Sequence, residues 1–115
     1  MKHGISYEQG EIVLAPFPFT DLSTVKQRPL LILSNNKYNS KTEDLITCGI
    51  TSNPRDTEFS VIISNTDLIS GQIPLESRIK VDKLFTLNQK IIKKKIGMVK
   101  KEILEQVKEE FLKIL

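Results

Sequence analysis

The chain has 115 residues, of which 39% are hydrophobic and 27% charged, and its net charge is +3 at pH 7. This length suits one domain with a modest core, so we expect a single domain over residues 1–115. The composition is that of a globular protein and excludes a disordered chain, and no apolar run approaches the roughly 20 residues of a membrane-spanning helix.

The first half of the chain predicts three strands joined by polar connections. Residues 11–17 form an apolar run rich in β-formers, and the prolines near its end suit a strand end or an edge. A polar loop over residues 20–27 leads to a second strand at 29–34. Asparagine and serine within residues 35–40 predict a turn, and residues 45–52 are predicted to form a central strand.

The second half predicts two more strands and a helix. Residues 58–64 are enriched in β-branched side chains, and residues 65–71 suggest a turn or a short irregular piece. Residues 77–85 alternate polar with apolar side chains, which is typical of a strand with one face pointing inward. After a short turn over residues 89–95, the apolar residues from position 100 onward recur at helical spacing.

These elements predict a mainly β fold, a compact barrel-like antiparallel sheet capped by a C-terminal amphipathic helix. We expect the apolar stripe of the helix to cover the barrel, with a free partner-binding helix as the alternative. The lysine run at residues 93–95 is either a solvated surface or an auxiliary phosphate contact.

Several familiar chemistries lack their residues. Clustered metal ligands are missing, since the chain offers only His3 and Cys48 far apart, so we expect no metal site and no cofactor. No glycine-rich phosphate loop is present, and the single histidine excludes a histidine pair as acid and base. Cys48 stands in an apolar stretch and is predicted to be a core residue. With no apolar signal core at residues 1–10 and no second cysteine, we expect a cytoplasmic protein.

Three places at predicted strand ends carry candidate functional residues: Arg28, the pair Thr51 and Ser52, and residues 76–78. Strand ends beside loops are where a β scaffold exposes its chemistry. Each place also has an ordinary interpretation: a surface arginine, turn chemistry, or a weak surface ion pair.

At these residues the chain resembles the MazF/PemK-type toxins of bacterial toxin-antitoxin modules. The matching segments are GEIVL at residues 10–14, FPFTDL at 17–22, KQRPLLILS at 26–34, ITS at 50–52 and SRIKVDKL at 77–84. They occur in the family's order, and the resemblance extends over roughly residues 10–112.

The resemblance implies an SH3-like barrel that forms a homodimer, a sequence-selective endoribonuclease activity without a metal ion, and neutralisation by a cognate antitoxin. By this resemblance Arg28 and Thr51 match the catalytic arginine and threonine. The segment of Glu76, Ser77 and Arg78 matches a region where relatives carry an acidic or amide residue used in catalysis or RNA contact, so these three are further candidates. Some relatives carry a histidine or serine in the first loop, several residues before the arginine, where this chain has no histidine and its nearest polar candidates are Ser23 and Thr24.

The residues suit this chemistry independently of the resemblance. RNA can be cleaved by its own 2'-hydroxyl attacking the adjacent phosphate, so the protein needs to supply charge stabilisation and proton transfer. The guanidinium of Arg28 can hold a phosphate in bidentate fashion and stabilise the phosphorane. Thr51 can bind a phosphate oxygen or orient the 2'-hydroxyl, and Glu76 can accept a proton.

We expect single-stranded RNA to be held by further polar residues around these three. The candidates are Ser23, Thr24, Lys26, Ser52, Arg55, Ser77 and Arg78. Candidates for stacking on bases or reading their edges are Phe17, Phe19 and Tyr38, and Asn35, Asn36 and Arg55. Two alternatives remain: a non-catalytic toxin of the same barrel fold that inhibits DNA gyrase, and a nucleic-acid-binding module without activity.

Overall fold

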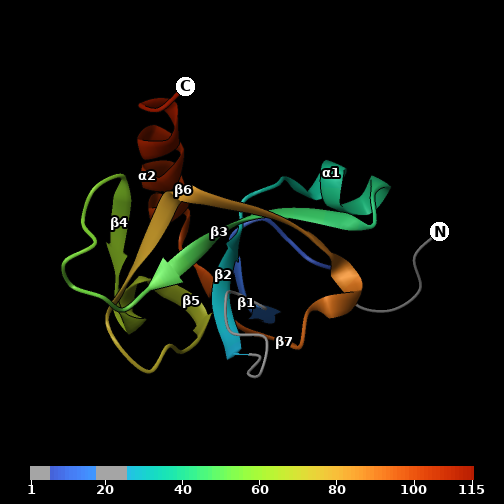
Figure 1. Cartoon of the computed structure of the whole chain (residues 1–115), viewed down its shortest axis with the longest axis horizontal. Coiled ribbons are helices and arrows are strands. Elements are labelled where there is room, and N and C mark those ends of the chain that lie inside the picture. Colours follow the sequence, from blue (N-terminus) through green and yellow to red (C-terminus); the bar gives the residue numbers. More distant parts are fainter. Residues whose placement is uncertain (1–5, 18–25) are drawn as a thin grey trace.

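The computed structural model of the chain describes residues 6–17 and 26–115, and its order of elements is followed in Figure 1. The strands are β1 (Glu11–Phe17), β2 (Lys26–Ile32), β3 (Asp44–Thr51), β4 (Ser60–Ile63), β5 (Leu68–Gly71), β6 (Ser77–Asn88) and β7 (Lys94–Val99). The helices are α1 (Asn36–Lys41) and α2 (Lys101–Leu112), with short 3-10 turns at η1 (Asn65–Asp67) and η2 (Gln89–Ile91). None of these helices has the length and apolar character needed to cross a lipid bilayer.

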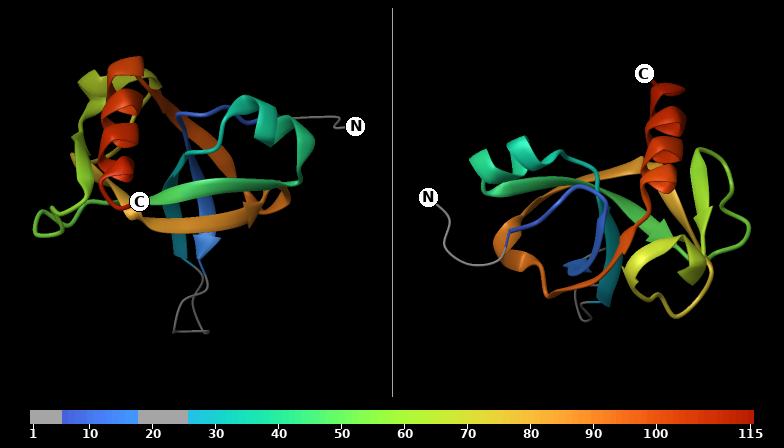
Figure 2. Two further views of the ribbon diagram at one scale, coloured as in Figure 1. Left: turned by 90° about the horizontal axis from the view of Figure 1, so that it is seen from above. Right: turned by 180° about the vertical axis from the view of Figure 1, so that it is seen from behind.

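In the described residues the strands form one sheet in the order β4-β6-β3-β2-β1-β7-β5, with every neighbouring pair antiparallel. The sheet curls round on itself, and α2 stands beside β4 and β6 (Figures 1 and 2). The prediction of a mainly β barrel with a C-terminal helix is confirmed. Ile103 and Val107, one helical turn apart, are buried against the sheet, so α2 covers the barrel as its apolar stripe indicates.

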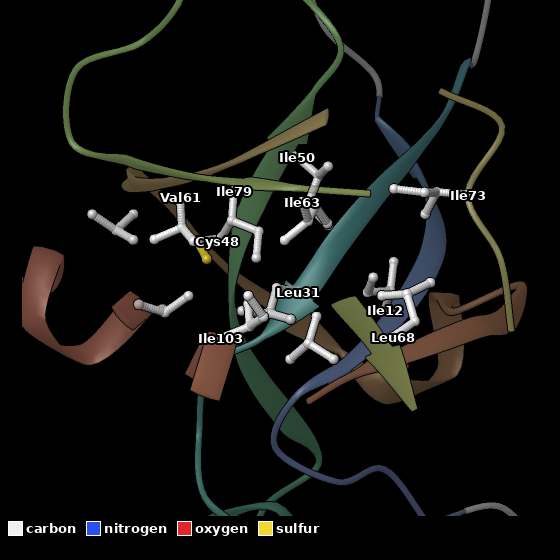
Figure 3. Packing of buried hydrophobic residues seen from close by; sticks show 13 residues of the cluster. Ile12, Leu31, Cys48, Ile50, Val61, Ile63, Leu68, Ile73, Ile79 and Ile103 are labelled. Atoms are coloured by element: carbon white, nitrogen blue, oxygen red, sulfur yellow. The ribbon is translucent and has the colours of Figure 1, made fainter. Parts of the chain in front are cut away.

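Apolar clusters lie on both faces of the central strands. The first contains Ile12, Leu31 and Cys48 together with side chains from β4, β6 and α2, and Figure 3 shows these side chains converging. The second contains Leu30 and Leu45. Because successive side chains in a strand point to opposite faces, Leu30 and Leu31 belong to different clusters. Cys48 is fully buried, as predicted, and burial raises the pKa of its thiol from 9.0 to about 12.

Two strands and one helix differ from the sequence predictions. The segment expected to be a turn at 89–95 ends in strand β7, which pairs with both β1 and β5. The segment expected to be irregular at 65–71 contains β5, and the expected turn at 35–40 is largely α1. Both missed strands are short: β7 begins with two exposed lysines, and β5 buries only Leu68. Their pairing partners therefore specify them more than their own pattern does.

Strand β6 bends where its pairing with β3 changes register. Leu84 pairs with Cys48, whereas Lys80 pairs with the next β3 residue, Gly49, so residues 81–83 have no counterpart on β3. Ile79 and Val81 point into the core, as their alternation predicts. The predicted pattern of buried apolar and exposed polar side chains is wrong at two positions of this strand. Lys80 is only 3% exposed, and Leu84 is 44% exposed. The bend turns Lys80 into a pocket.

Candidate functional site

Arg28 and Thr51 lie on the neighbouring antiparallel strands β2 and β3. These strands pair from Ile32 and Thr47 to Leu30 and Gly49, so Arg28 and Thr51 each lie two residues beyond the last pair. Both residues line the same two pockets. Arg28 is exposed and Thr51 half-buried. The structure therefore brings together the guanidinium and the hydroxyl that the sequence offers from separate strands.

The larger pocket is a groove of about 470 Å³. Besides Arg28 and Thr51, its polar lining includes Ser52 and Ser77, and Lys94 contributes a second cation. The opposite wall is the segment of residues 72–75, which connects β5 to β6. Two positive side chains and several hydroxyl groups in one groove suit an anionic, hydrogen-bonding ligand.

The second pocket, of about 340 Å³, lies on the face of the sheet that carries Arg28, Gly49 and Thr51. Its remaining polar lining consists of Asp56, Lys80 and Lys83, and Phe85 and Leu30 supply apolar surface. Charged groups of both signs therefore surround this pocket.

A third, smaller pocket of about 90 Å³ adjoins Thr51 from the other side. Thr51 pairs with Arg78 across β3 and β6, and Glu76, Ser77 and Arg78 line this pocket with Ser52. The Arg78 guanidinium donates to the Ser60 hydroxyl at 3.2 Å. In the pockets lined by described residues, Thr51 belongs to all three, whereas Glu76 and Arg78 line only the smallest, which Arg28 does not line.

The Thr51 hydroxyl is oriented by the connection that follows β3. Its Oγ1 accepts a hydrogen bond from the backbone N–H of Asn53 at 3.1 Å. The Asn53 side-chain oxygen accepts from the N–H of Arg55 at 3.0 Å, which forms a tight turn. A hydroxyl that accepts one bond still carries a proton to donate. The Thr51 hydroxyl is thus held in place with its donor capacity retained.

Sequence comparison decides the family. Residues 8–115 match the profile of the family described as PemK-like, MazF-like toxin of type II toxin-antitoxin system. The chain belongs to this family. Comparison with individual curated proteins gives no match. The resemblance expected from the segments at 10–14, 17–22, 26–34, 50–52 and 77–84 is confirmed.

Solved structures of this toxin fold agree with the family assignment. An endoribonuclease in complex with its cognate antitoxin, from a mycobacterial species, has 19% identity and a TM-score of 0.77, covering 94% of this chain and 93% of that chain. A MazE-MazF structure from Deinococcus radiodurans has 19% identity and a TM-score of 0.77, with 96% of each chain covered. The Mycobacterium tuberculosis toxin MazF-mt6 has 19% identity and a TM-score of 0.68, covering 88% and 91%.

The remaining predicted RNA contacts of this MazF-like chain are distributed unevenly. Ser23, Thr24 and Phe19, and the side chain of Phe17, lie outside the described part of the structure. Lys26 at the start of β2 and Arg55 in the β3–β4 connection are exposed, and neither lines the three pockets just described.

Asn35 and Asn36, at the start of α1, each have a structural role. Asn35 caps α1 by accepting from the N–H of Tyr38 at 2.8 Å, and Asn36 accepts from the N–H of Gln9 at 2.8 Å. Their amide oxygens are thus used within the fold. Both residues are exposed and keep their side-chain NH2 donors, so base-edge reading by these two amides stays a prediction.

Sequence reasoning missed three charged residues of the second pocket. Asp56, Lys80 and Lys83 line it with Arg28 and Thr51, yet none was a candidate for a functional role. Lys94, from the lysine run considered as an auxiliary phosphate contact, lines the groove. Lys80 lies within the matching segment at 77–84, and this proximity to Arg78 was the signal available. Within residues 6–17 and 26–115, no three His, Cys, Asp or Glu side chains are grouped so as to hold a metal ion.

Proposed function

We propose that this MazF-like toxin is an endoribonuclease that cleaves single-stranded RNA, without a metal ion, by attack of the RNA 2'-hydroxyl on the adjacent phosphate. The observation that carries the proposal is the presence of Arg28 and Thr51 in the same two pockets. The structures of MazF-like folds described as endoribonucleases support it as relatives in fold.

The proposed chemistry assigns a separate role to each group. Attack of the 2'-oxygen on phosphorus forms a 2',3'-cyclic phosphate and releases the 5'-oxygen of the next nucleotide, which takes up a proton. Arg28 stabilises the negative charge that develops on the phosphorane oxygens. The Thr51 hydroxyl donates to a phosphate oxygen or orients the 2'-hydroxyl. Both roles need only groups that the groove already contains.

The proton transfer is assigned to Glu76 as the candidate acceptor. Glu76 lines the smallest pocket together with Thr51, Ser52 and Ser77, and these three residues also line the groove. A carboxylate at this position reaches a 2'-hydroxyl only if the RNA passes over Thr51. The role of Glu76 therefore requires an RNA path that crosses Thr51 between the groove and the smallest pocket.

The proposed partners are single-stranded RNA, a cognate antitoxin and a second copy of the chain. Structures of MazE-MazF complexes on this fold support an antitoxin partner. Arg28 and Lys94 make the groove suited to acidic peptide side chains as well as to phosphates. Sedimentation equilibrium measures the homodimer directly, and a monomer at all concentrations would exclude it.

The test is cleavage of a defined single-stranded RNA in the presence of a chelator. We expect cleavage with EDTA, products ending in a cyclic phosphate, and no cut where the scissile nucleotide is 2'-deoxy. Arg28→Ala is expected to lose roughly 100-fold or more in kcat, because the phosphorane charge is then unsupported. Thr51→Ala is expected to lose less, since a single neutral hydrogen bond is removed.

Controls separate this activity from contamination and from the alternative functions. Lys108→Met, on the exposed face of α2, changes the net charge as Arg28→Ala does and is expected to cleave normally. A strict requirement for divalent cations, or full activity in Arg28→Ala, contradicts the proposal. Inhibition of DNA gyrase without any RNA cleavage would favour the non-catalytic toxin.

A further inference from the structure

Lys80 is a buried lysine enclosed by acceptors. Its side chain is only 4% exposed, and its ammonium lies 2.9 Å from an Asp56 carboxylate oxygen and 3.6 Å from one of Asp82. It also donates to the backbone carbonyl of Glu58. Lysine is almost never this buried unless it is paired, because removing an ammonium from water is strongly unfavourable.

The charge at position 80 requires an explanation beyond packing. An apolar side chain of similar size would fill the same space without desolvating an ammonium. The ammonium has three N–H donors and a charge, and it holds the carboxylate of Asp56 and the carbonyl of Glu58 at one point. Both acceptors belong to the connection of residues 52–59 between β3 and β4.

Lys80 lines the second pocket, the one of about 340 Å³ that Arg28 and Thr51 also line. It pairs with Gly49 on β3, two residues before Thr51 on the same strand and therefore on the same face. Asp56 lines this pocket as well. The ion pair is therefore part of the wall of the proposed catalytic pocket.

A chain of hydrogen bonds joins the ion pair to the Thr51 hydroxyl. The N–H of Asp56 donates to the carbonyl of Asn53 at 3.3 Å, and the N–H of Asn53 donates to Thr51 Oγ1 at 3.1 Å. Lys80 thus fixes Asp56, Asp56 fixes Asn53, and Asn53 orients the hydroxyl. Each step is a direct contact, so a displacement of Asp56 would also displace the Thr51 hydroxyl.

We propose that Lys80 is a positioning residue for the cleavage reaction, anchoring the β3–β4 connection through Asp56 so that Asn53 holds the Thr51 hydroxyl in its productive orientation. This inference rests on the proposed ribonuclease function and deepens it. Lys80 acts through Thr51, so its effect belongs to kcat more than to KM.

The test compares Lys80→Met with Lys80→Arg by single-turnover and steady-state cleavage of RNA in EDTA. We expect Lys80→Met to lose kcat several-fold, up to roughly 10-fold and no more than Thr51→Ala loses, with little change in KM, because Lys80 acts only through the Thr51 hydroxyl. Lys80→Arg retains a cation for Asp56 and is expected to restore most of kcat. Lys108→Met, which removes an exposed lysine 3.7 Å from Glu105, is the matched control and should behave like the wild type.

Two mutant cycles distinguish positioning from a general loss of structure. In the Thr51→Ala background, Lys80→Met should have little further effect on kcat, because the group it positions is absent. Asp56→Asn and Lys80→Met should be non-additive, because each breaks the same link. Equal fold-losses in both backgrounds, or a loss of activity that follows the folded fraction measured by circular dichroism, would overturn the proposal.

A readout independent of RNA tests the anchor itself. Trypsin cleaves after Arg55, next to Asp56 in the anchored connection, and Lys80→Met should accelerate that cut several-fold while Lys80→Arg should not. An unchanged rate would exclude anchoring. If the wild type cleaves no RNA, the proposed function fails, and the catalytic part of this inference fails with it, whatever the trypsin result.

Discussion

Neighbouring residues of one type have different roles when their surroundings differ, and Lys94 and Lys95 illustrate this. Lys94 lines the groove with Arg28. Lys95 forms an ion pair with Glu11 at 3.1 Å, donates to the carbonyl of Ser6 at 2.7 Å and lies over the Tyr7 ring. Adjacent residues of a strand point to opposite faces, so the lysine run divides between a site and a structural contact.

We predict that Lys94→Gln raises KM for RNA several-fold and leaves kcat nearly unchanged. The reason is that Lys94 offers a cation to the phosphate backbone at some distance from the reacting phosphate. The effect should shrink as ionic strength rises, since salt screens this contact. Lys95→Gln is the control, and an equal rise of KM in that variant would show that net charge alone matters.

At the scale of elements, β5 and β7 form a pair that their own sequences specify weakly. Gly71 has a φ of +76°, and a Cβ there would lie 2.0 Å from the carbonyl oxygen of Ile96. The two backbones can approach only because this residue has no side chain. The pair positions residues 72–75, which form the opposite wall of the groove.

We predict that Gly71→Ala lowers the free energy of unfolding by about 2 kcal/mol or more, since a strained φ is combined with a backbone clash. Urea unfolding followed by circular dichroism measures this change. Gly49→Ala is a matched control, because a Cβ there would meet only side-chain atoms at 3.6 Å, an ordinary contact distance. Similar destabilisation in both variants would contradict the explanation.

At the scale of the whole molecule, the curled sheet brings together groups from distant parts of the chain. Arg28 comes from β2, Thr51 from β3, Ser77 from β6 and Lys94 from β7. The strands are held in this arrangement by a core whose first cluster includes the fully buried Cys48 (Figure 3). The stability of that core, and of the site with it, is therefore linked to the protonation of a buried thiol.

We predict that the free energy of unfolding falls as pH rises from 9 toward 12, in part because of Cys48. Burial raises the pKa of its thiol from 9.0 to about 12, so over this range the unfolded chain loses the thiol proton and the native protein keeps it. Each such group contributes a slope of up to about 1.4 kcal/mol per pH unit. Cys48→Ala should show a shallower fall than the wild type, and identical slopes would exclude this linkage.

The sequence predicted the elements whose patterns are strong. Strands β1, β2, β3, β4 and β6 and helix α2 lie where alternation, β-branched runs and helical spacing placed them, with ends shifted by a few residues. The errors occurred at β5, β7 and α1. These elements are short, at four to six residues each, so their local pattern carries little information, and the structure specifies them through partners distant in the chain.

By itself the sequence determined the fold class, the family and the residue types able to bind a phosphate, because these depend on local pattern and on matching segments. Only the tertiary structure decided which of those residues meet. The β2–β3 pairing brought Arg28 and Thr51 to the same pockets, the bend in β6 buried Lys80 beside Asp56, and the β7 pairing directed Lys94 to the groove. The physical reason is that proximity between strands is set by register and curvature, which involve residues far apart in the chain.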